Sequence, residues 1–261
     1  MPETDLLERD PQSEFVQSLS RGLNVIRAFE HQTGSLTPTD ISDRTGLSRA
    51  AARRFLLTLV HDGYAATDGK RFTLTPKVLG LGFAFLSSME IADLAQPALT
   101  DLATIVRESC SASMLDGTDI IYVARVAAAR IMQVGLGVGS RLPAFCTSMG
   151  RVLLAGLSPS ALDDYFAAAR LTPLTERTVT AEGPLRRLLG DVRGQGYALV
   201  DGELEPGLRS ISVPILRRSG AVAAAATICT VESRRSIDEM LTVCLPALRA
   251  AAERIAHSLP G

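Results

Sequence analysis

The chain has 261 residues, and its 27 basic side chains nearly balance 28 acidic ones, for a formal net charge of −1. Hydrophobic residues make up 46% and charged residues 21%, which is ordinary globular usage and excludes a wholly disordered, collagen-like or low-complexity chain. The four cysteines are dispersed, with no CxxC and no Cys/His cluster, so we expect reduced thiols, no disulfide framework and no structural zinc.

The start of the chain argues against export, and its longest apolar run argues against a membrane span. MPETDLLERDPQSEF is acidic and lacks the basic and apolar regions of a signal peptide. The run at 78–89 is shorter than the roughly 18 residues that a transmembrane helix needs. We therefore expect a cytoplasmic protein that makes no membrane contact.

The charge is unevenly distributed along the chain. Residues 1–17 carry five acidic residues against one arginine, whereas residues 18–75 carry eight basic residues against five acidic ones. We expect residues 1–14 to be a disordered acidic tail that precedes a mildly basic module. A neutral total therefore does not exclude a nucleic-acid partner, although the asymmetry alone is weak evidence for one.

Two helices are predicted at the start of the basic module. Residues 18–31 place four apolar side chains at helical spacing behind Ser18 or Ser20 as the N-cap: Leu19, Leu23, Ile26 and Phe29. Residues 37–46 read as a short helix because Thr37 suits the N-cap and Pro38 suits the first helical position. Gly46 then suits the end of that helix.

A third helix and a hairpin follow. Residues 47–63 begin a new helix after the N-cap Ser48 and have one apolar stripe, formed by Phe55, Leu56, Leu59 and Val60. Residues 64–67 and 71–75 read as two strands that turn at Asp68-Gly69. A helix, a helix-turn-helix pair and a hairpin in this order predict a winged helix-turn-helix domain over residues 15–75.

The helix at 47–63 has the composition of a recognition helix. Small side chains near its N-terminus let the backbone approach the major groove, Arg53 is long enough to reach a guanine edge, and Arg54 suits a phosphate. We expect double-stranded DNA to be contacted by Arg21, Thr37, Ser48, Arg49, Ala50, Ala51, Arg53, Arg54, Lys70 and Arg71. Any one of these arginines is equally compatible with a solvated helix face, so the ordered set of caps, helices and hairpin carries the interpretation.

The rest of the chain predicts a linker helix and a second domain. Residues 76–91 read as the linker helix, whose apolar side favours either a dimer contact or packing onto its own domain. Residues 92–261 predict an α+β domain, an antiparallel sheet flanked by helices, similar in layout to GAF-type sensors of small molecules. Its predicted strands are 111–115, 119–126, 130–135, 197–203, 208–216 and 221–230. The predicted helices are 91–109, 147–157, 160–171, 182–196 and 236–259.

Three stretches resemble the IclR family of bacterial transcriptional regulators, and the likeness covers nearly the whole chain from about residue 15. They are SLSRGLNVIRAF with LSRAAARRFLLTLVHDGY, GSRLP leading into TSMGRVLLAGL, and GYALVDGELEPGLRSISVPI. RAAARRFLLTL and LVDGELEPGLRSISVP are similar to the branch that regulates aromatic-acid catabolism through the β-ketoadipate pathway, the PcaR, PcaU and PobR types.

The resemblance implies a homodimer formed through the DNA-binding domains, often paired into a dimer of dimers, with an effector pocket in the C-terminal domain. It implies a small organic acid as the effector, such as protocatechuate, 4-hydroxybenzoate or β-ketoadipate, and no cofactor. The positions that match the family's ligand contacts are Ser148, Met149, Ser210, Thr227 and Cys229. We expect Leu142 and Phe145 to give a ring an apolar wall, and the helix N-terminus near Ser148 to favour an anion.

Several residues admit two interpretations. Arg125 and Arg141 can pair with a carboxylate or serve as exposed or interface charges. Cys229 can be a reactive thiol or, as we favour, a small pocket or core residue. Three acidic residues that alternate along one strand suggest a metal or acid–base site, but a solvated strand end or an interdomain salt bridge is favoured: Asp201, Glu203 and Glu205.

No enzyme signature is present in a supporting context, whether GxSxG, HExxH or Ser-x-x-Lys, so we expect no catalytic residues. The glycine run at 135–139 matches neither GxGxxG nor the Walker pattern, and a turn in the sheet is expected there. The alternative that stays open beside an effector-controlled regulator is an architectural DNA-binding protein that ignores ligands.

Overall fold

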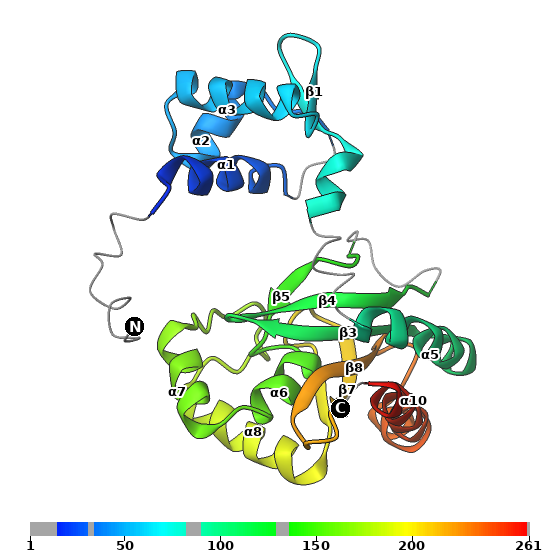
Figure 1. The fold of residues 1–261 in the computed structure, drawn as a ribbon. Helices are drawn as coiled ribbons and strands as arrows, with labels where there is room; N and C mark the ends of the chain where they lie inside the picture. The colour runs from blue at the N-terminus through cyan, green and yellow to red at the C-terminus, as the bar shows by residue number, and fades with distance from the viewer. Residues whose placement is uncertain (1–14, 31–33, 82–89, 129–135, 260–261) are drawn as a thin grey trace, which may run out of the picture. The chain divides into compact units, whose positions relative to one another are not determined.

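A computed structural model describes residues 15–30, 34–81, 90–128 and 136–259, and the chain divides into two compact units, Met1–Phe85 and Leu86–Gly261 (Figure 1). The expected acidic tail and the strand expected at 130–135 lie outside the described residues, as does residue range 82–89 of the expected linker helix. At the start of that linker, Pro76–Val78 form a short 3-10 helix, η2.

The N-terminal unit has the predicted winged helix-turn-helix order. Its elements are α1 (Gln17–Arg27), α2 (Pro38–Thr45), α3 (Arg49–His61), β1 (Ala65–Thr67) and β2 (Phe72–Leu74). The two strands pair antiparallel, and Leu36 adds a bridge to Phe72. A small core fills the space between the helices and the hairpin, built on Val25, Ile41, Ala52, Leu56 and Phe72.

The predicted caps fix the turn between α2 and α3. The Thr37 hydroxyl accepts a hydrogen bond from the Asp40 amide at 3.2 Å, and the Asp40 carboxylate accepts one from the Thr37 amide at 2.7 Å. The hydrogen bonds that the amide and the hydroxyl of Thr37 donate to the Asp40 carboxylate hold the pKa of Asp40 below its usual range. Gly46 ends α2 with a φ of 71°, a left-handed conformation that favours glycine. The Ser48 hydroxyl then accepts from the Ala51 amide, so α3 begins at Arg49 as expected.

The expected start and apolar stripe of α1 are wrong in part. The helix begins after Val16, whose side chain cannot cap, and Ser18 lies inside the helix. Val25 is fully buried, but Leu19 and Leu23 are 63% and 46% exposed. The unit is too small to cover every apolar side chain on α1, and only the face toward α3 is buried.

The C-terminal unit is the predicted α+β domain. Its six-stranded antiparallel sheet has the order β5-β4-β3-β8-β7-β6. The strands are β3 (Ser109–Asp116), β4 (Asp119–Val126), β5 (Arg141–Pro143), β6 (Ala198–Asp201), β7 (Leu208–Leu216) and β8 (Val222–Val231). The β3–β4 hairpin turns at Gly117, and β5 is a short edge strand that the sequence did not predict.

Helices cover both faces of this sheet (Figure 1). One face packs against α5 (Glu90–Val106) and α10 (Leu245–Ser258). The other face packs against α6 (Ser148–Ala155), with α7 (Pro159–Ala168) and α8 (Glu182–Gln195) beyond it. Among the described residues, no helix is long and apolar enough to cross a bilayer.

The last predicted helix forms over 237–258, but a π-helical turn interrupts its α-helical pattern. It consists of a short turn, α9 (Ile237–Glu239), a π-helical turn, η3 (Met240–Cys244), and then α10. Pro246 stands in the first turn of α10 and has no N–H to donate to the preceding turn. The π turn therefore ends just before this proline, and the α-helix resumes at Leu245.

Candidate effector site and nucleic-acid interface

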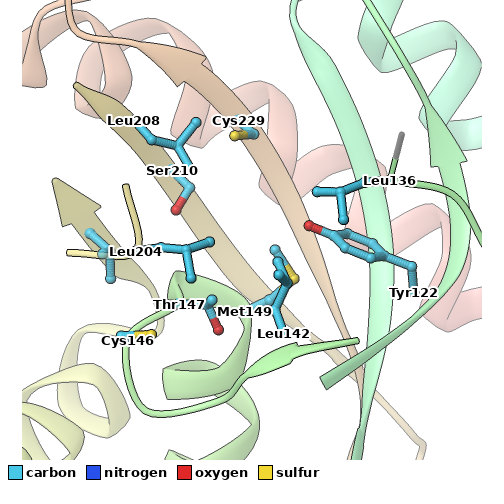
Figure 2. Close-up of a pocket in the computed structure, with 11 residues that line it drawn as sticks. Tyr122, Leu136, Leu142, Cys146, Thr147, Met149, Leu204, Leu208, Ser210 and Cys229 are labelled. Carbon is cyan, nitrogen blue, oxygen red and sulfur yellow. The ribbon is translucent and has the colours of Figure 1, made fainter. Parts of the chain in front are cut away.

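A small pocket lies on the α6 side of the sheet, where β4, β7 and β8 face the start of α6 (Figure 2). Its volume is about 20 Å³. The walls are mainly apolar, and the lining residues are Tyr122, Leu136, Leu142, Cys146, Thr147, Met149, Val200, Leu204, Leu208, Ser210 and Cys229.

Two hydroxyl groups give the pocket its polar ends. Figure 2 shows the hydroxyls of Tyr122 and Ser210 entering from different sides and directed toward the interior. Burial raises the pKa of Tyr122 above its usual range, and the charge of Arg125 opposes that shift. The Tyr122 hydroxyl is therefore protonated at neutral pH and can donate a hydrogen bond as well as accept one.

A chain of buried hydroxyls lies directly behind Ser210. The Ser148 hydroxyl donates to that of Ser210 at 2.8 Å and shares a 2.7 Å hydrogen bond with that of Ser212. Ser212 in turn shares a 2.7 Å bond with Thr227. Ser148 and Thr227, both expected to touch the effector, thus lie behind the pocket wall and orient Ser210.

Four of the expected effector residues line the pocket, namely Leu142, Met149, Ser210 and Cys229. Phe145 does not: it lies at a second cavity, on the other side of the segment that connects β5 to α6. The guanidinium Nε of Arg151 donates to the Phe145 carbonyl at 3.1 Å and holds that segment in place. Within the segment, Phe145 lines the second cavity, whereas Cys146 lines the pocket.

Sequence reasoning missed most of the apolar wall. Tyr122 was open to prediction, because it shares a strand face with buried Ile120. Cys146 and Thr147 were also open to prediction, because they immediately precede Ser148, a position that matches the family's ligand contacts. Leu204 belongs to the connection between β6 and β7, and Leu208 begins β7; both reach the pocket only through the sheet order, which the local pattern does not contain.

The pocket thiols are not poised as nucleophiles. Burial raises the pKa of Cys229 to about 11 and that of Cys146 to about 12, so both are protonated at neutral pH. Cys229 is thus a small pocket residue, the interpretation that the sequence favoured. No group of three or more His, Cys, Asp or Glu able to hold a metal occurs in the part of the chain that the structure describes.

Arg125 stands beside the pocket. Its guanidinium carbon lies 5.5 Å from the centre of the Tyr122 ring. Its Nε is buried without a hydrogen-bond partner among the described residues. The positive charge of Arg125 also lowers the pKa of Cys229 against the larger effect of burial. Arg125 thus places positive charge next to two lining residues.

Arg141 has a different role. Its guanidinium pairs with Asp116 and donates to Asp119 at 3.4 Å, and its side chain is 42% exposed. These contacts tie β5 to the β3–β4 hairpin. Arg141 therefore matches the exposed interpretation rather than that of a pocket cation.

The three acidic residues within 201–205 have different surroundings. Asp201 accepts from Arg209 at 2.8 Å and from Arg177 at 2.9 Å. Glu205 is exposed. The expectation of a solvated strand end is wrong for Glu203, whose carboxylate is buried and accepts from Arg151 Nη2 at 2.7 Å. This ion pair lies within the C-terminal unit, because the chain after β6 turns back toward α6.

The exposed side of α3 carries four of the ten predicted DNA contacts. Arg49, Ala50, Arg53 and Arg54 are exposed there, as are Arg21 on α1 and Lys70 in the hairpin turn. Ala51 is half-buried, and Thr37 and Ser48 act as helix caps. Arg71 donates to the side chain and carbonyl of Ser35 at 2.7 and 2.8 Å, so its guanidinium also braces the hairpin.

Two family models match this chain. The model described as "IclR helix-turn-helix domain" matches residues 18–69, and "Bacterial transcriptional regulator IclR C-terminal" matches residues 83–257. Among individual relatives, the Pca regulon regulatory protein of Pseudomonas putida is 45% identical over 95% of this chain and 86% of its own length. The p-hydroxybenzoate hydroxylase transcriptional activator of Acinetobacter baylyi is 34% identical over 93% of this chain and 91% of its own.

The chain is also similar to solved structures of transcriptional regulators. A transcriptional regulator from Rhodococcus sp. RHA1 is 49% identical with a TM-score of 0.83, covering 93% of this chain and 98% of that chain. A double mutant of the PobR inducer-binding domain from Acinetobacter, in complex with 3-hydroxybenzoic acid, is 30% identical with a TM-score of 0.59. The match covers 63% of this chain and 96% of that chain. The chain therefore belongs to the IclR family of bacterial transcriptional regulators, in the branch of its Pca and PobR relatives.

Proposed function

We propose that this chain is a cytoplasmic regulator whose binding to operator DNA is controlled by a small aromatic acid or another acid of the β-ketoadipate pathway. Residues 15–75 bind the DNA, and residues 92–261 bind the acid in the pocket between Tyr122 and Ser210. Residues 76–91 link these two domains. The observation that carries the proposal is the convergence of two hydroxyls, a neighbouring arginine and a helix N-terminus on one apolar pocket. The test is whether such an acid changes the affinity for the protein's own operator.

The pocket chemistry suits a hydroxybenzoate-like ligand. Leu142, Met149 and Leu204 offer apolar contacts to a ring. The first turn of α6 has amides without intrahelical partners and a dipole that favours an anion, and Arg125 adds a full positive charge nearby. The hydroxyls of Tyr122 and Ser210 supply the donors and acceptors that a phenol or carboxylate needs. These groups favour an effector-controlled regulator over a DNA-binding protein that ignores ligands.

Ligand entry requires the pocket to open. A volume of about 20 Å³ holds about one water molecule and not a benzoate ring. Met149 is the lining residue best suited to move, because its unbranched side chain has three rotatable bonds. A ligand that selects the open arrangement of this wall also shifts the start of α6, and this gives the acid a route by which to act on the rest of the protein.

The DNA contacts are separable by mutation. If Arg53 reads a base and Arg54 contacts a phosphate, Arg53→Ala lowers the preference for the operator over random duplex by about 1–3 kcal/mol per half-site. Arg54→Ala instead weakens binding to all duplexes alike and makes the salt dependence shallower. Fluorescence anisotropy at several salt concentrations measures both. Equal losses for the two variants with unchanged salt slopes would contradict this assignment.

Dimerisation is part of the same proposal. A module with three excess basic residues neutralises few phosphates, so useful affinity needs two modules on paired half-sites. An exposed apolar strip runs from the segment before α1 into the helix and is formed by Phe15, Val16, Leu19 and Leu23. It offers the contact surface for a second copy, and two such dimers then pair into a tetramer.

Charge placed on this strip therefore weakens the dimer. Leu19→Lys is expected to reduce self-association by about tenfold or more, because the ammonium group loses its hydration at the interface. Sedimentation velocity measures the effect. Ile105→Lys, at an equally exposed apolar position of the C-terminal unit, is the control. Unchanged self-association of Leu19→Lys would exclude this strip as the interface.

A further inference from the structure

A second cavity, distinct from the effector pocket, lies between α7 and the sheet edge at β5. Its volume is about 270 Å³, far larger than that of the effector pocket. The lining residues are Thr118, Asp119, Pro143, Phe145, Tyr165, Ala168, Ala169 and Arg170. The cavity holds polar groups as well as apolar surface, so it is more than a packing defect.

The hydroxyl of Tyr165 is the first sign of a ligand. Tyr165 is only 5% exposed, it lines the cavity, and its hydroxyl has no hydrogen-bond partner among the described residues. Buried hydroxyls in native proteins are normally hydrogen-bonded, so an unpaired hydroxyl beside a cavity suggests that a ligand in the cavity supplies its partner. Burial raises the pKa of Tyr165, Cys146 and Asp119 raise it further, and the nearby backbone of Phe145 opposes the shift. The group is therefore a neutral donor at physiological pH.

The remaining polar groups define the class of that partner. Asp119 brings a carboxylate, which Arg141 engages through Nε at 3.4 Å, and Arg170 brings an exposed guanidinium at the cavity. Positive and negative charge are thus both present, which favours a neutral molecule. A hydroxyl group on this molecule can accept from Tyr165 and donate to Asp119. Phe145 and Pro143 offer apolar surface for an aromatic ring.

The segment between β5 and α6 separates this cavity from the effector pocket. Leu142, Cys146 and Thr147 line the effector pocket, whereas Pro143 and Phe145 line the second cavity. The segment is firmly held: the Ala144 amide donates to the Thr118 carbonyl at 3.1 Å. A Cβ at Gly150 would collide with the Ala144 backbone, so the segment packs directly on α6. A shift on one side therefore moves the wall of the other.

From these contacts we infer that the second cavity binds a small neutral phenol, and that its occupant changes the affinity of the effector pocket through the shared segment 142–149. The binding site stands on its own geometry. The effect on the effector rests on the proposed function, because it requires an acid in the first pocket. A phenol and an aromatic acid would then be sensed together by one chain.

Calorimetric titration of the full chain with phenol tests the site. Ala168→Trp fills the cavity from an exposed position at the end of α7 and is expected to abolish binding. Ala167→Trp, its exposed neighbour outside the cavity lining, should bind within about twofold of the parent. Tyr165→Phe, which keeps the ring, should bind about fivefold to tenfold more weakly. Absence of phenol binding, or equal binding by the two tryptophan variants, would overturn the site.

The coupling is tested by titrating 4-hydroxybenzoate with and without saturating phenol. We expect its dissociation constant to change at least about fivefold in the parent and in Ala167→Trp, but not in Ala168→Trp. An unchanged constant in the parent would overturn the coupling. If 4-hydroxybenzoate does not bind at all, the proposed function fails for this acid, while the phenol titrations still decide whether the second site exists.

Discussion

Arg151→Ala is expected to lower the free energy of unfolding of the C-terminal unit by about 3–5 kcal/mol. The side chains of Arg151 and Glu203 are only 4% and 10% exposed, and they meet at 2.7 Å. Removal of the guanidinium leaves the Glu203 carboxylate buried with the Val179 amide, at 3.1 Å, as its one remaining donor among the described residues. It also frees the Phe145 carbonyl, which Arg151 holds.

Differential scanning calorimetry measures this effect, and a fall of about 10 °C in the Tm of the C-terminal unit is expected. Arg186→Ala is the matched control, since its ion pairs with Asp163 and Glu182 are screened by solvent and contribute little to stability. Replacement of both Arg151 and Glu203 by leucine should recover much of the loss, because no charge is then left unpaired. Similar Tm values for Arg151→Ala and Arg186→Ala would show that the pair does not stabilise the fold.

Ser210→Leu is expected to abolish stabilisation by the effector. An acid present at 100 times its Kd stabilises the parent by about 2.7 kcal/mol, which corresponds to a rise of about 5–10 °C in Tm. Leucine at position 210 fills the pocket and removes the hydroxyl that Ser148 orients. Thermal shifts with protocatechuate, 4-hydroxybenzoate and β-ketoadipate measure the difference, and the Tm of the variant without ligand reports its own folding.

Two further variants separate shape from charge. Arg125→Gln should weaken binding of carboxylates but leave an uncharged analogue such as 4-hydroxybenzamide unaffected, because only the cation is removed. Ser219→Leu, in the exposed β7–β8 turn, should respond to acids as the parent does. If Ser210→Leu keeps the full shift, the acid binds elsewhere; if Arg125→Gln affects both ligands equally, Arg125 supports the pocket without pairing with the carboxylate.

The DNA-binding unit was largely predictable because its signals are local. Thr37, Gly46 and Ser48 mark helix ends through contacts within a few residues, and Asp68 forms the hairpin turn by accepting from the amides of Lys70 and Arg71. The local pattern did not predict the buried face of α1 correctly, because contacts with α3 determine which side chains of that helix are covered. Leu19 and Leu23 have the spacing of core residues but lie outside the core.

The effector pocket was predictable only in part, because the sheet order assembles it. Ser210 and Cys229 are register partners on adjacent strands, and the resemblance to known regulators pointed to both positions. The burial of Glu203 depends on Arg151, which lies 52 residues earlier in the chain. Tyr122 and Leu208 likewise line one pocket from strands that are distant in sequence. Pairings of this kind leave no signal in the periodicity of either segment.

The central claim is that a small acid controls binding to DNA, and the most direct measurement is an operator titration with and without the acid. The operator is first selected from random duplexes by the protein itself, and anisotropy then gives the Kd with and without protocatechuate, 4-hydroxybenzoate and β-ketoadipate. We predict that at least one acid changes the Kd by about fivefold or more, and that Ser210→Leu keeps its ligand-free Kd but loses this response. An operator Kd that no acid changes would contradict the account and identify a DNA-binding protein that ignores these ligands.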